Sequence, residues 1–368
     1  MPTVVQDILA EMERIAPPWL ACADDPAGFH AGERQAPVER VLLALDATPD
    51  VVAEAKALGV QLLVVHHPRI YAPLKTLATE TAAARALTEA VKAGIAIYSA
   101  HTALDIVAGG INDLLADAAG LPAAGRQPIS TEVDEPLYKL VVYLPEDARE
   151  RLSAALWTAG AGHIGNYSHC SFFQAGTGTF LGHEGSHPAI GTPGHLEQVR
   201  EARAEYIVPE SKLAACTEAL RQVHPYEEPA FDLVVLRQTR RFGLGRWGSL
   251  SSAVKLNVLA RQMQQTTASP QAQLFGDPER PVQRVGVWCG GGFPEAKAGE
   301  LHLDAIVVGE LGYHALEQLA MDRVGAIVLG HGPSEEIVLP SLQEKLQAAF
   351  PALDIRIATS KAPALCNF

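Results

Sequence analysis

The segment QLLVVHHPRIY, residues 61–71, determines how the rest of the chain is interpreted. A short run of branched apolar residues ends at two adjacent histidines, His66 and His67, and Pro68 follows directly. Such a run, bounded by glycines and helical patterns, is typical of a buried parallel strand. Because proline ends a strand, both imidazoles are expected at its carboxyl end.

Three further segments end with the same kinds of side chain. They are GIAIYSAHTALD (94–105) with His101 and Asp105, DAIVVGELGYH (304–314) with Glu310 and His314, and GAIVLGHGPSEE (325–336) with His331 and Glu335. Ligands of open α/β sheets bind outside the carboxyl ends of the strands. Imidazole and carboxylate together suit zinc, manganese, iron or cobalt. One histidine pair is weak evidence, but several candidates at the same topological position favour a metal site.

The bulk properties exclude several classes of protein. A chain of 368 residues with 48% hydrophobic and 19% charged residues predicts an ordinary globular protein of two or three domains. The net charge of -13 argues against nucleic-acid binding. Five scattered cysteines without CxxC spacing favour reduced thiols and a cytoplasmic location. The first 20 residues predict an amphipathic helix rather than a signal peptide, and no apolar run is long enough for a membrane span.

The order of predicted elements indicates a split domain. Residues 1–125 form a first α/β lobe and residues 246–368 a second, so the fold class is a bilobed split α/β domain whose polar strand ends meet between the lobes. In the first lobe we predict helices over 3–15, from Pro49 to Gly59 with Thr48 as its cap, 79–93 and 109–119, and strands over 40–45, 61–65 and 95–99. In the second we predict helices over 251–263 and 313–322, strands over 284–289, 304–308 and 325–329, and a final helix and strand. Pro340 predicts that the helix beginning at Glu335 is short or restarts at the proline.

Residues 126–245 have a different character and predict an inserted ferredoxin-like α+β module. The pattern indicates the order β-α-β-β-β-α-β, which is the ferredoxin-like order with an extra strand. The extra strand comes from a glycine-rich hairpin predicted over NYSHCSFFQAGTGTFLG, residues 166–182. The acidic segment HPYEEPAFD (224–232) is interpreted as a structural turn that enters the last strand.

Several candidate residues have alternative interpretations. His101 is either a direct metal ligand or a proton-transfer residue. Asp46, at the end of VLLALD, is interpreted as an Asx turn in preference to a site residue. Ser334 is predicted to cap a helix that begins at Glu335. The loop CGGGF (289–293) is either an anion cradle or a closely packed turn.

The four motifs HHP, SAHTALD, VVGELGYH and GHGPSEE, in this order and interrupted by an α+β module, resemble the Nif-three-like dinuclear-metal-centre proteins, the GTP cyclohydrolase I type 2 homologues. The resemblance covers both outer lobes, and the insert is similar to the PII/CutA-like module of the longer members. It implies metal ligands at His66, His67, Asp105, His331 and Glu335. The GHY of many members is GHG here, which removes an aromatic side chain from the site.

The resemblance also implies an activity and an assembly. Five ligands with two carboxylates suit two divalent ions about 3.5–4 Å apart. We expect a metal-dependent hydrolase for a small phosphorylated or nucleotide substrate, with His101 in proton transfer and Glu310 or His314 in substrate contact. The alternatives are a regulatory or scaffold protein without turnover and a metal chaperone. A toroidal homohexamer is implied for the assembly.

Overall fold

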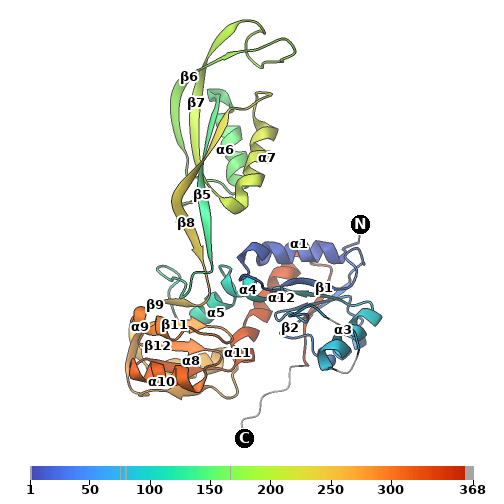
Figure 1. The fold of residues 1–368 in the computed structure, drawn as a ribbon, viewed down its shortest axis with the longest axis vertical. Helices are drawn as coiled ribbons and strands as arrows, with labels where there is room; N and C mark the ends of the chain where they lie inside the picture. Colours follow the sequence, from blue (N-terminus) through green and yellow to red (C-terminus); the bar gives the residue numbers. More distant parts are fainter. Residues whose placement is uncertain (1, 75, 79–80, 166, 361–368) are drawn as a thin grey trace. The chain divides into compact units, whose positions relative to one another are not determined.

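The computed structural model describes residues 2–74, 76–78, 81–165 and 167–360 (Figure 1). The contacts divide the chain into a unit of residues 1–133 and 242–368, and a second unit of residues 134–241. The second unit therefore interrupts the sequence of the first.

The first sheet of the larger unit is mostly parallel, because its central strands follow one another through helices. In the described residues its order is β1-β4-β3-β2-β14, with antiparallel pairing only at the β1 edge. All four residues of β3 are buried, as expected for a strand that is covered on both faces. The strands are β1 (Gly28–Ala31), β2 (Arg40–Ala44), β3 (Leu62–Val65), β4 (Ala96–Ser99) and β14 (Asp354–Ile357).

Two helices of the first lobe, α2 and α3, begin at threonines whose side chains cap them. Thr48 caps α2, its Oγ1 accepting a hydrogen bond of 3.2 Å from the Val51 amide. Thr81 caps α3 in the same way, so this helix begins at Ala82; residues 79 and 80 of the predicted helix lie outside the described residues. The helices are α1 (Val5–Ile15), α2 (Pro49–Ala57), α3 (Ala82–Lys92), α4 (His101–Ile106) and α5 (Ile111–Ala118).

The second sheet has the order β10-β13-β12-β11-β9 over the described residues, with β11, β12 and β13 parallel. The helix predicted over 251–263 is wrong in its first half, because β9 continues to Lys255 and pairs with β11. Val254 and Lys255 pair with Val282 and Pro281 of β11, and the helix starts only at Leu256. The strands are β9 (Arg246–Lys255), β10 (Gln273–Phe275), β11 (Pro281–Trp288), β12 (Ala305–Val308) and β13 (Gly325–Val328).

The end of the chain connects the two lobes. Pro340 lies in the first turn of α12, so the last helical region is divided at Ile337, as the proline predicts. β14 then joins the first sheet beside β2. One hydrophobic cluster contains Leu43 and Val64 of the first sheet and Val287 and Val307 of the second. The helices are α8 (Leu256–Thr266), α9 (Ala296–Glu300), α10 (Tyr313–Met321), α11 (His331–Glu336) and α12 (Val338–Ala349).

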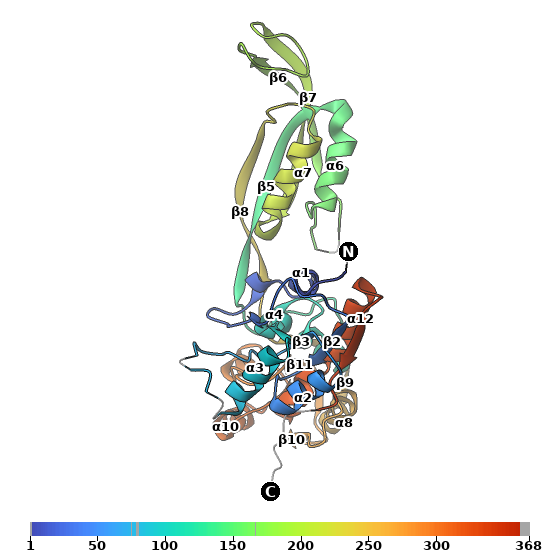
Figure 2. The ribbon, with the colours of Figure 1, turned by 90° about the vertical axis from the view of Figure 1, so that its right-hand side faces the viewer.

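The second unit is a ferredoxin-like sandwich whose sheet has the order β6-β7-β5-β8 in its described part. Figure 2 shows both helices on one face of this sheet. The predicted hairpin over 166–182 is wrong: residue 166 lies outside the described residues, and FFQAGTGTFL is one continuous strand that pairs with β7. The order is therefore β-α-β-β-α-β, without the extra strand. The elements are β5 (Val133–Pro145), α6 (Arg149–Thr158), β6 (Phe172–Leu181), β7 (Leu196–Pro209), α7 (Leu213–Val223) and β8 (Phe231–Phe242).

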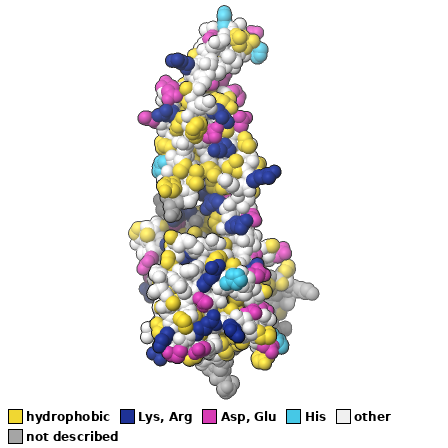
Figure 3. All heavy atoms as spheres, turned by 90° about the vertical axis from the view of Figure 1, so that its left-hand side faces the viewer, with side chains coloured by type: hydrophobic (Ala, Val, Ile, Leu, Met, Phe, Trp, Pro, Cys, Tyr) yellow, Lys and Arg dark blue, Asp and Glu magenta, His cyan; other side chains and the backbone are white. Residues whose placement is uncertain are grey.

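Short 3-10 turns complete the structure at Pro18–Leu20, Glu146–Ala148 and Glu210–Lys212. Of the described helices, none combines the length and apolar character that crossing a membrane requires. Cys216 and Cys289 are buried and Cys22 and Cys170 half-buried, all as free thiols, whereas Cys366 lies outside the described residues. Figure 3 shows acidic and basic side chains interspersed on the visible face of the larger unit.

Candidate metal centre

The predicted site residues follow the carboxyl ends of parallel strands in both sheets of the larger unit. His66 and His67 follow β3, and His101 begins α4 directly after β4. His331 begins α11 after β13. The backbone amides of His66 and His67 continue the β3 ladder by donating to Ala44 and Leu45 at 3.2 and 2.9 Å. Both imidazoles are therefore held at the end of the strand, as the proline in HHP predicts.

Glu335 lies at the centre of a group of side chains that we call the metal cluster: His66, His67, Asp105, His331 and Glu335. Its Oε2 lies 3.0 Å from His67 Nε2, and its Oε1 lies 3.2 Å from His331 Nε2 and 3.7 Å from His66 Nε2. The Glu335 side chain is only 4% exposed, so its charge is removed from water. His66, His67 and Glu335 offer ligand atoms that all lie within 4.8 Å of one another. This group has the composition and spacing that a divalent metal ion requires.

Asp105 adds a second buried carboxylate beside His66. Its Oδ1 lies 3.6 Å from His66 Nε2, and the side chain is 9% exposed. The backbone carbonyl of Asp105 accepts a hydrogen bond of 3.0 Å from Asn112, whose side-chain amide also contacts Cys289 Sγ at 3.2 Å. These contacts hold the end of α4 in place and direct the carboxylate to His66.

Several buried polar atoms of the cluster have no hydrogen-bond partner: His66 Nδ1, Asp105 Oδ1 and Glu335 Oε2. Glu335 Oε2 is close to His67 Nε2 but outside hydrogen-bonding geometry. His67 Nε2 also lies 3.3 Å from His331 Nε2. Buried polar atoms without partners are destabilising, and a cation between the two carboxylates and the converging nitrogens would satisfy those that face it. The side chains therefore fit a divalent metal.

The electrostatics of the cluster agree with this interpretation. Burial by itself raises the pKa of Glu335, but the three imidazoles outweigh it and hold that pKa well below its ordinary value. Burial by itself lowers the pKa of His67, but the neighbouring carboxylates of Asp46 and Glu335 outweigh it and raise that pKa to about 10. The hydrogen bond to Glu335 is the main reason that the pKa of His331 rises to about 9. Protonated imidazoles thus balance the Glu335 charge, which is the role a divalent cation would take.

Asp46 orients His67, and this differs from the Asx turn that the sequence favoured. Its Oδ1 accepts a hydrogen bond of 2.9 Å from His67 Nδ1. A carboxylate that binds one ring nitrogen directs the other nitrogen toward a metal and increases its basicity. The position of Asp46 at the end of β2, next to β3, was the signal that could have identified it.

Asp25 holds His101 in a similar way, and the sequence alone did not identify it. Its Oδ1 accepts a hydrogen bond of 2.7 Å from His101 Nδ1, and its Oδ2 accepts from the backbone amide of Thr102 at 3.1 Å and from the Thr102 hydroxyl. His101 has a φ of 32°, in the region that favours glycine, so its backbone is strained. The ring centroids of His101 and His66 are 5.5 Å apart. His101 therefore lies beside the cluster with its Nε2 free of Asp25.

Glu310 and His314 differ in their relation to the cluster. Glu310 Oε1 lies 3.3 Å from His331 Nδ1, and its side chain is 59% exposed, so Glu310 lies at the rim. The side chain of His314 is 92% exposed, and its Nδ1 lies 3.5 Å from Glu317 on the same helix. The structure brings Glu310 to the site but does not bring His314 there.

The loop CGGGF is a closely packed turn in which acidic side chains occupy the adjacent space. A Cβ on Gly290 would collide with Glu335 Oε1, and one on Gly291 would collide with Glu310 Oε1. The Gly290 amide donates a 2.9 Å hydrogen bond to Ser334 Oγ, so this amide is not free for an anion. Ser334 lies inside α11, which begins at His331, and its predicted role as a helix cap is wrong. Its hydroxyl joins two loops of the site instead.

The sequence and the fold of this chain are both similar to those of known proteins. The sequence profile described as Duf34/NIF3 (NGG1p interacting factor 3) matches residues 3–364. The GTP cyclohydrolase 1 type 2 homolog of Halalkalibacterium halodurans is 40% identical over 344 residues, which cover 93% of this chain and 92% of that protein. The homolog from Bacillus subtilis is 36% identical over 343 residues, covering 93% and 91%. The crystal structure of a Bacillus cereus protein related to NIF3 superposes with a TM-score of 0.90 at 34% identity, over 100% of both chains.

Proposed function

The chain belongs to the DUF34/NIF3 family, and on this premise we propose that it is a metal-dependent hydrolase with two divalent ions around Glu335. The observation that carries the proposal is one buried carboxylate in contact with three imidazoles, beside a second buried carboxylate. His66, His67, Asp105, His331 and Glu335 would hold the ions. Glu335 would contribute from the middle of the group, because its Oε1 lies near His66 and His331 and its Oε2 lies near His67.

When bound, two divalent ions lower the pKa of a shared water and polarise phosphate oxygens. His101 would accept the proton of the attacking water on Nε2. An ionised carboxylate only accepts hydrogen bonds, so Asp25 requires the proton of His101 on Nδ1 and leaves Nε2 as the basic nitrogen. Burial raises the pKa of Asp25, but the bonds from His101 and Thr102 outweigh it and lower that pKa overall, so the carboxylate stays ionised.

The substrate class we propose is a small phosphorylated molecule, with nucleotides as the first candidates. A chain with a net charge of -13 does not attract phosphates by itself, but bound cations reverse the charge locally. The name GTP cyclohydrolase 1 type 2 homolog, carried by similar proteins, makes GTP the first nucleotide to test. Glu310 at the rim is a candidate for contact with the substrate.

The test is metal analysis of wild-type protein beside Glu335→Gln and Glu336→Gln, two variants with the same charge change at adjacent positions. We expect about two ions per chain in wild type and Glu336→Gln, and loss of both in Glu335→Gln. Wild-type protein that holds no metal after reconstitution with zinc, manganese, iron and cobalt would contradict the proposal. Once the metal content is known, hydrolysis of a panel of nucleotides, beginning with GTP, is measured for wild type and His101→Ala. Equal hydrolysis by the two proteins would contradict the proposed role of His101.

The inserted module supports a second candidate, a metal-holding regulatory protein without turnover. A ferredoxin-like unit with its own cavity has no evident role in hydrolysis. Light scattering of wild type and His66→Ala, combined with the nucleotide assay, separates the two. Turnover that disappears in His66→Ala while the oligomer, proposed as a hexamer, persists favours the hydrolase. Nucleotide binding without turnover in the metal-loaded wild type favours the regulator.

A further inference from the structure

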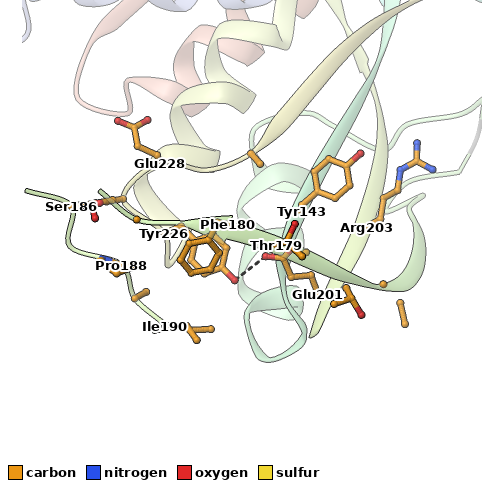
Figure 4. Close-up of a pocket in the computed structure, with 18 of the residues that line it drawn as sticks. Tyr143, Thr179, Phe180, Ser186, Pro188, Ile190, Glu201, Arg203, Tyr226 and Glu228 are labelled. Carbon is orange, nitrogen blue, oxygen red and sulfur yellow. Dashed lines mark hydrogen bonds between the residues drawn. The ribbon is translucent and has the colours of Figure 1, made fainter. Parts of the chain in front are cut away.

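The second unit contains a cavity of about 580 Å³ that the hydrolase proposal does not use (Figure 4). This volume is in the range of small-molecule sites. Its walls come from strands β5, β6 and β7, the loop after β6, and the turn between α7 and β8. The main side chains are Tyr143, Phe180, Pro188, Ile190, Glu201 and Tyr226.

Two glycines of β6 form the floor. Gly176 and Gly178 face the cavity from the same side of the strand, since residues two apart share a face. A Cβ on Gly176 would meet open space, and one on Gly178 would collide with Glu201 Oε2. Glycine weakens a strand interior and marks places where another group approaches closely. Here the group beside Gly178 is the Glu201 carboxylate.

Glu201 is held in a defined position within aromatic surroundings. Its Oε1 accepts a hydrogen bond of 2.9 Å from the Tyr226 hydroxyl, which is the dashed line in Figure 4. Figure 4 also shows Ile190, Pro188 and Ser186 of the loop on the opposite side from Arg203. The loop is attached to the turn because the His187 amide donates to Glu227 Oε1 at 2.9 Å. The carboxylate is thus positioned before any ligand arrives.

The charge of the lining excludes a phosphate ligand. Three carboxylates, of Glu201, Glu227 and Glu228, line the cavity, against one basic side chain, Arg203. Arg203 Nη1 is already paired with Glu205 Oε1 at 2.9 Å. A cation is therefore the complementary ligand, and the rings of Tyr143 and Tyr226 would stabilise it further.

We propose that this cavity binds an organic ammonium compound with an aromatic or apolar body, the ammonium group on Glu201 and the body over the glycine floor. The segment HPYEEPAFD, which the sequence presented as a structural turn, supplies Tyr226 and two of the carboxylates. The site is independent of the metal cluster and of the hydrolase proposal.

The test is calorimetric titration of the full-length protein with tryptamine and 2-phenylethylamine. We expect saturable binding that falls about 10- to 100-fold in Glu201→Gln, because the variant keeps the Tyr226 bond and loses the charge. Gly176→Leu should abolish binding by filling the cavity without a backbone clash. Glu218→Gln removes an equal charge from the exposed side of α7, outside the cavity, and should bind as wild type does.

Isosteric probes define the charge requirement. The neutral 2-phenylethanol and the anion 3-phenylpropionate should bind at least about tenfold more weakly than the amine. Equal binding of amine and alcohol, equal binding in wild type and Glu201→Gln, or no saturable binding to wild type would overturn the proposal. If wild type binds no amine, and light scattering shows that Gly176→Leu changes the mass of the oligomer, the cavity is instead a contact surface for a second copy of the chain.

Discussion

Two aspartate–histidine pairs at the metal cluster allow a sharp test of which histidines bind metal. Asp46 contacts His67, a proposed ligand, at 2.9 Å, and Asp25 contacts His101, a proposed proton acceptor, at 2.7 Å. Asp46→Asn and Asp25→Asn each keep an acceptor and remove one charge. We expect metal affinity to fall in Asp46→Asn and to stay within about threefold of wild type in Asp25→Asn.

The magnitude follows from the exposure of each pair. Carboxylates that orient metal-binding histidines contribute about 10- to 100-fold to affinity, or about 1.4–2.7 kcal/mol. His67 and Asp46 are 24% and 26% exposed, so solvent weakens their interaction. The pKa of His67, now about 10, would also fall in the variant, and metal would compete with a weaker proton. Both effects reduce the expected loss of metal affinity in Asp46→Asn to about tenfold, the lower end of this range.

The Asp25 pair is the stricter control because its bond is the shorter one and Asp25 is only 2% exposed. Bond strength alone would predict the larger effect in Asp25→Asn, whereas metal ligation predicts it in Asp46→Asn. The assay is competition for zinc with a chromophoric chelator at pH 7, with circular dichroism to verify the fold. Equal losses in both variants, or a loss only in Asp25→Asn, would refute the assignment of His67 as a metal ligand and of His101 as a proton acceptor that does not bind the metal.

Three further perturbations test local features of the structure. Gly290→Ala should lose metal in metal analysis, because its Cβ displaces Glu335. The control Gly292→Ala has open space around its Cβ and should keep the metal. In urea unfolding it should lose only about 1–2 kcal/mol of stability, because its backbone has a φ of +77°. Arg246→Met should lower the free energy of unfolding by about 3 kcal/mol in urea unfolding, because the buried guanidinium binds Asp113 and three backbone carbonyls. Arg280→Met, at a half-exposed arginine, is the control and should lower it much less. In Glu54, burial raises the pKa, but hydrogen bonds from Thr359 and Ser360 outweigh it and lower the pKa to about 2. The difference in the free energy of unfolding between wild type and Glu54→Gln should therefore be full above about pH 4.5 and disappear as the pH falls through about 2. Because Glu54 is partly exposed, solvent screening keeps this difference below about 1 kcal/mol, and urea unfolding at several pH values measures it.

The local pattern of the sequence was sufficient for the strands and for the residues that follow them. Short apolar runs that end at His66, His101 and His331 predict parallel strands, because strand burial and strand ends are encoded within a few residues. It also predicted the capping of α2 by Thr48 and the break before α12 at Pro340. The same local signals failed over 251–255, which continue strand β9, because pairing of Val254 and Lys255 with β11 outweighs the helical pattern.

Tertiary structure alone decided how the side chains of the site pair with one another. Asp25 binds His101 across 76 residues of sequence, and His67 meets His331 across 264. No periodicity records such contacts, since they depend on the packing of two sheets around one core. The closure of the cavity beside Glu201 has the same origin, because its three strands, its loop and its turn meet only after the module folds. A sequence specifies which groups are available at strand ends, and packing specifies which of them touch.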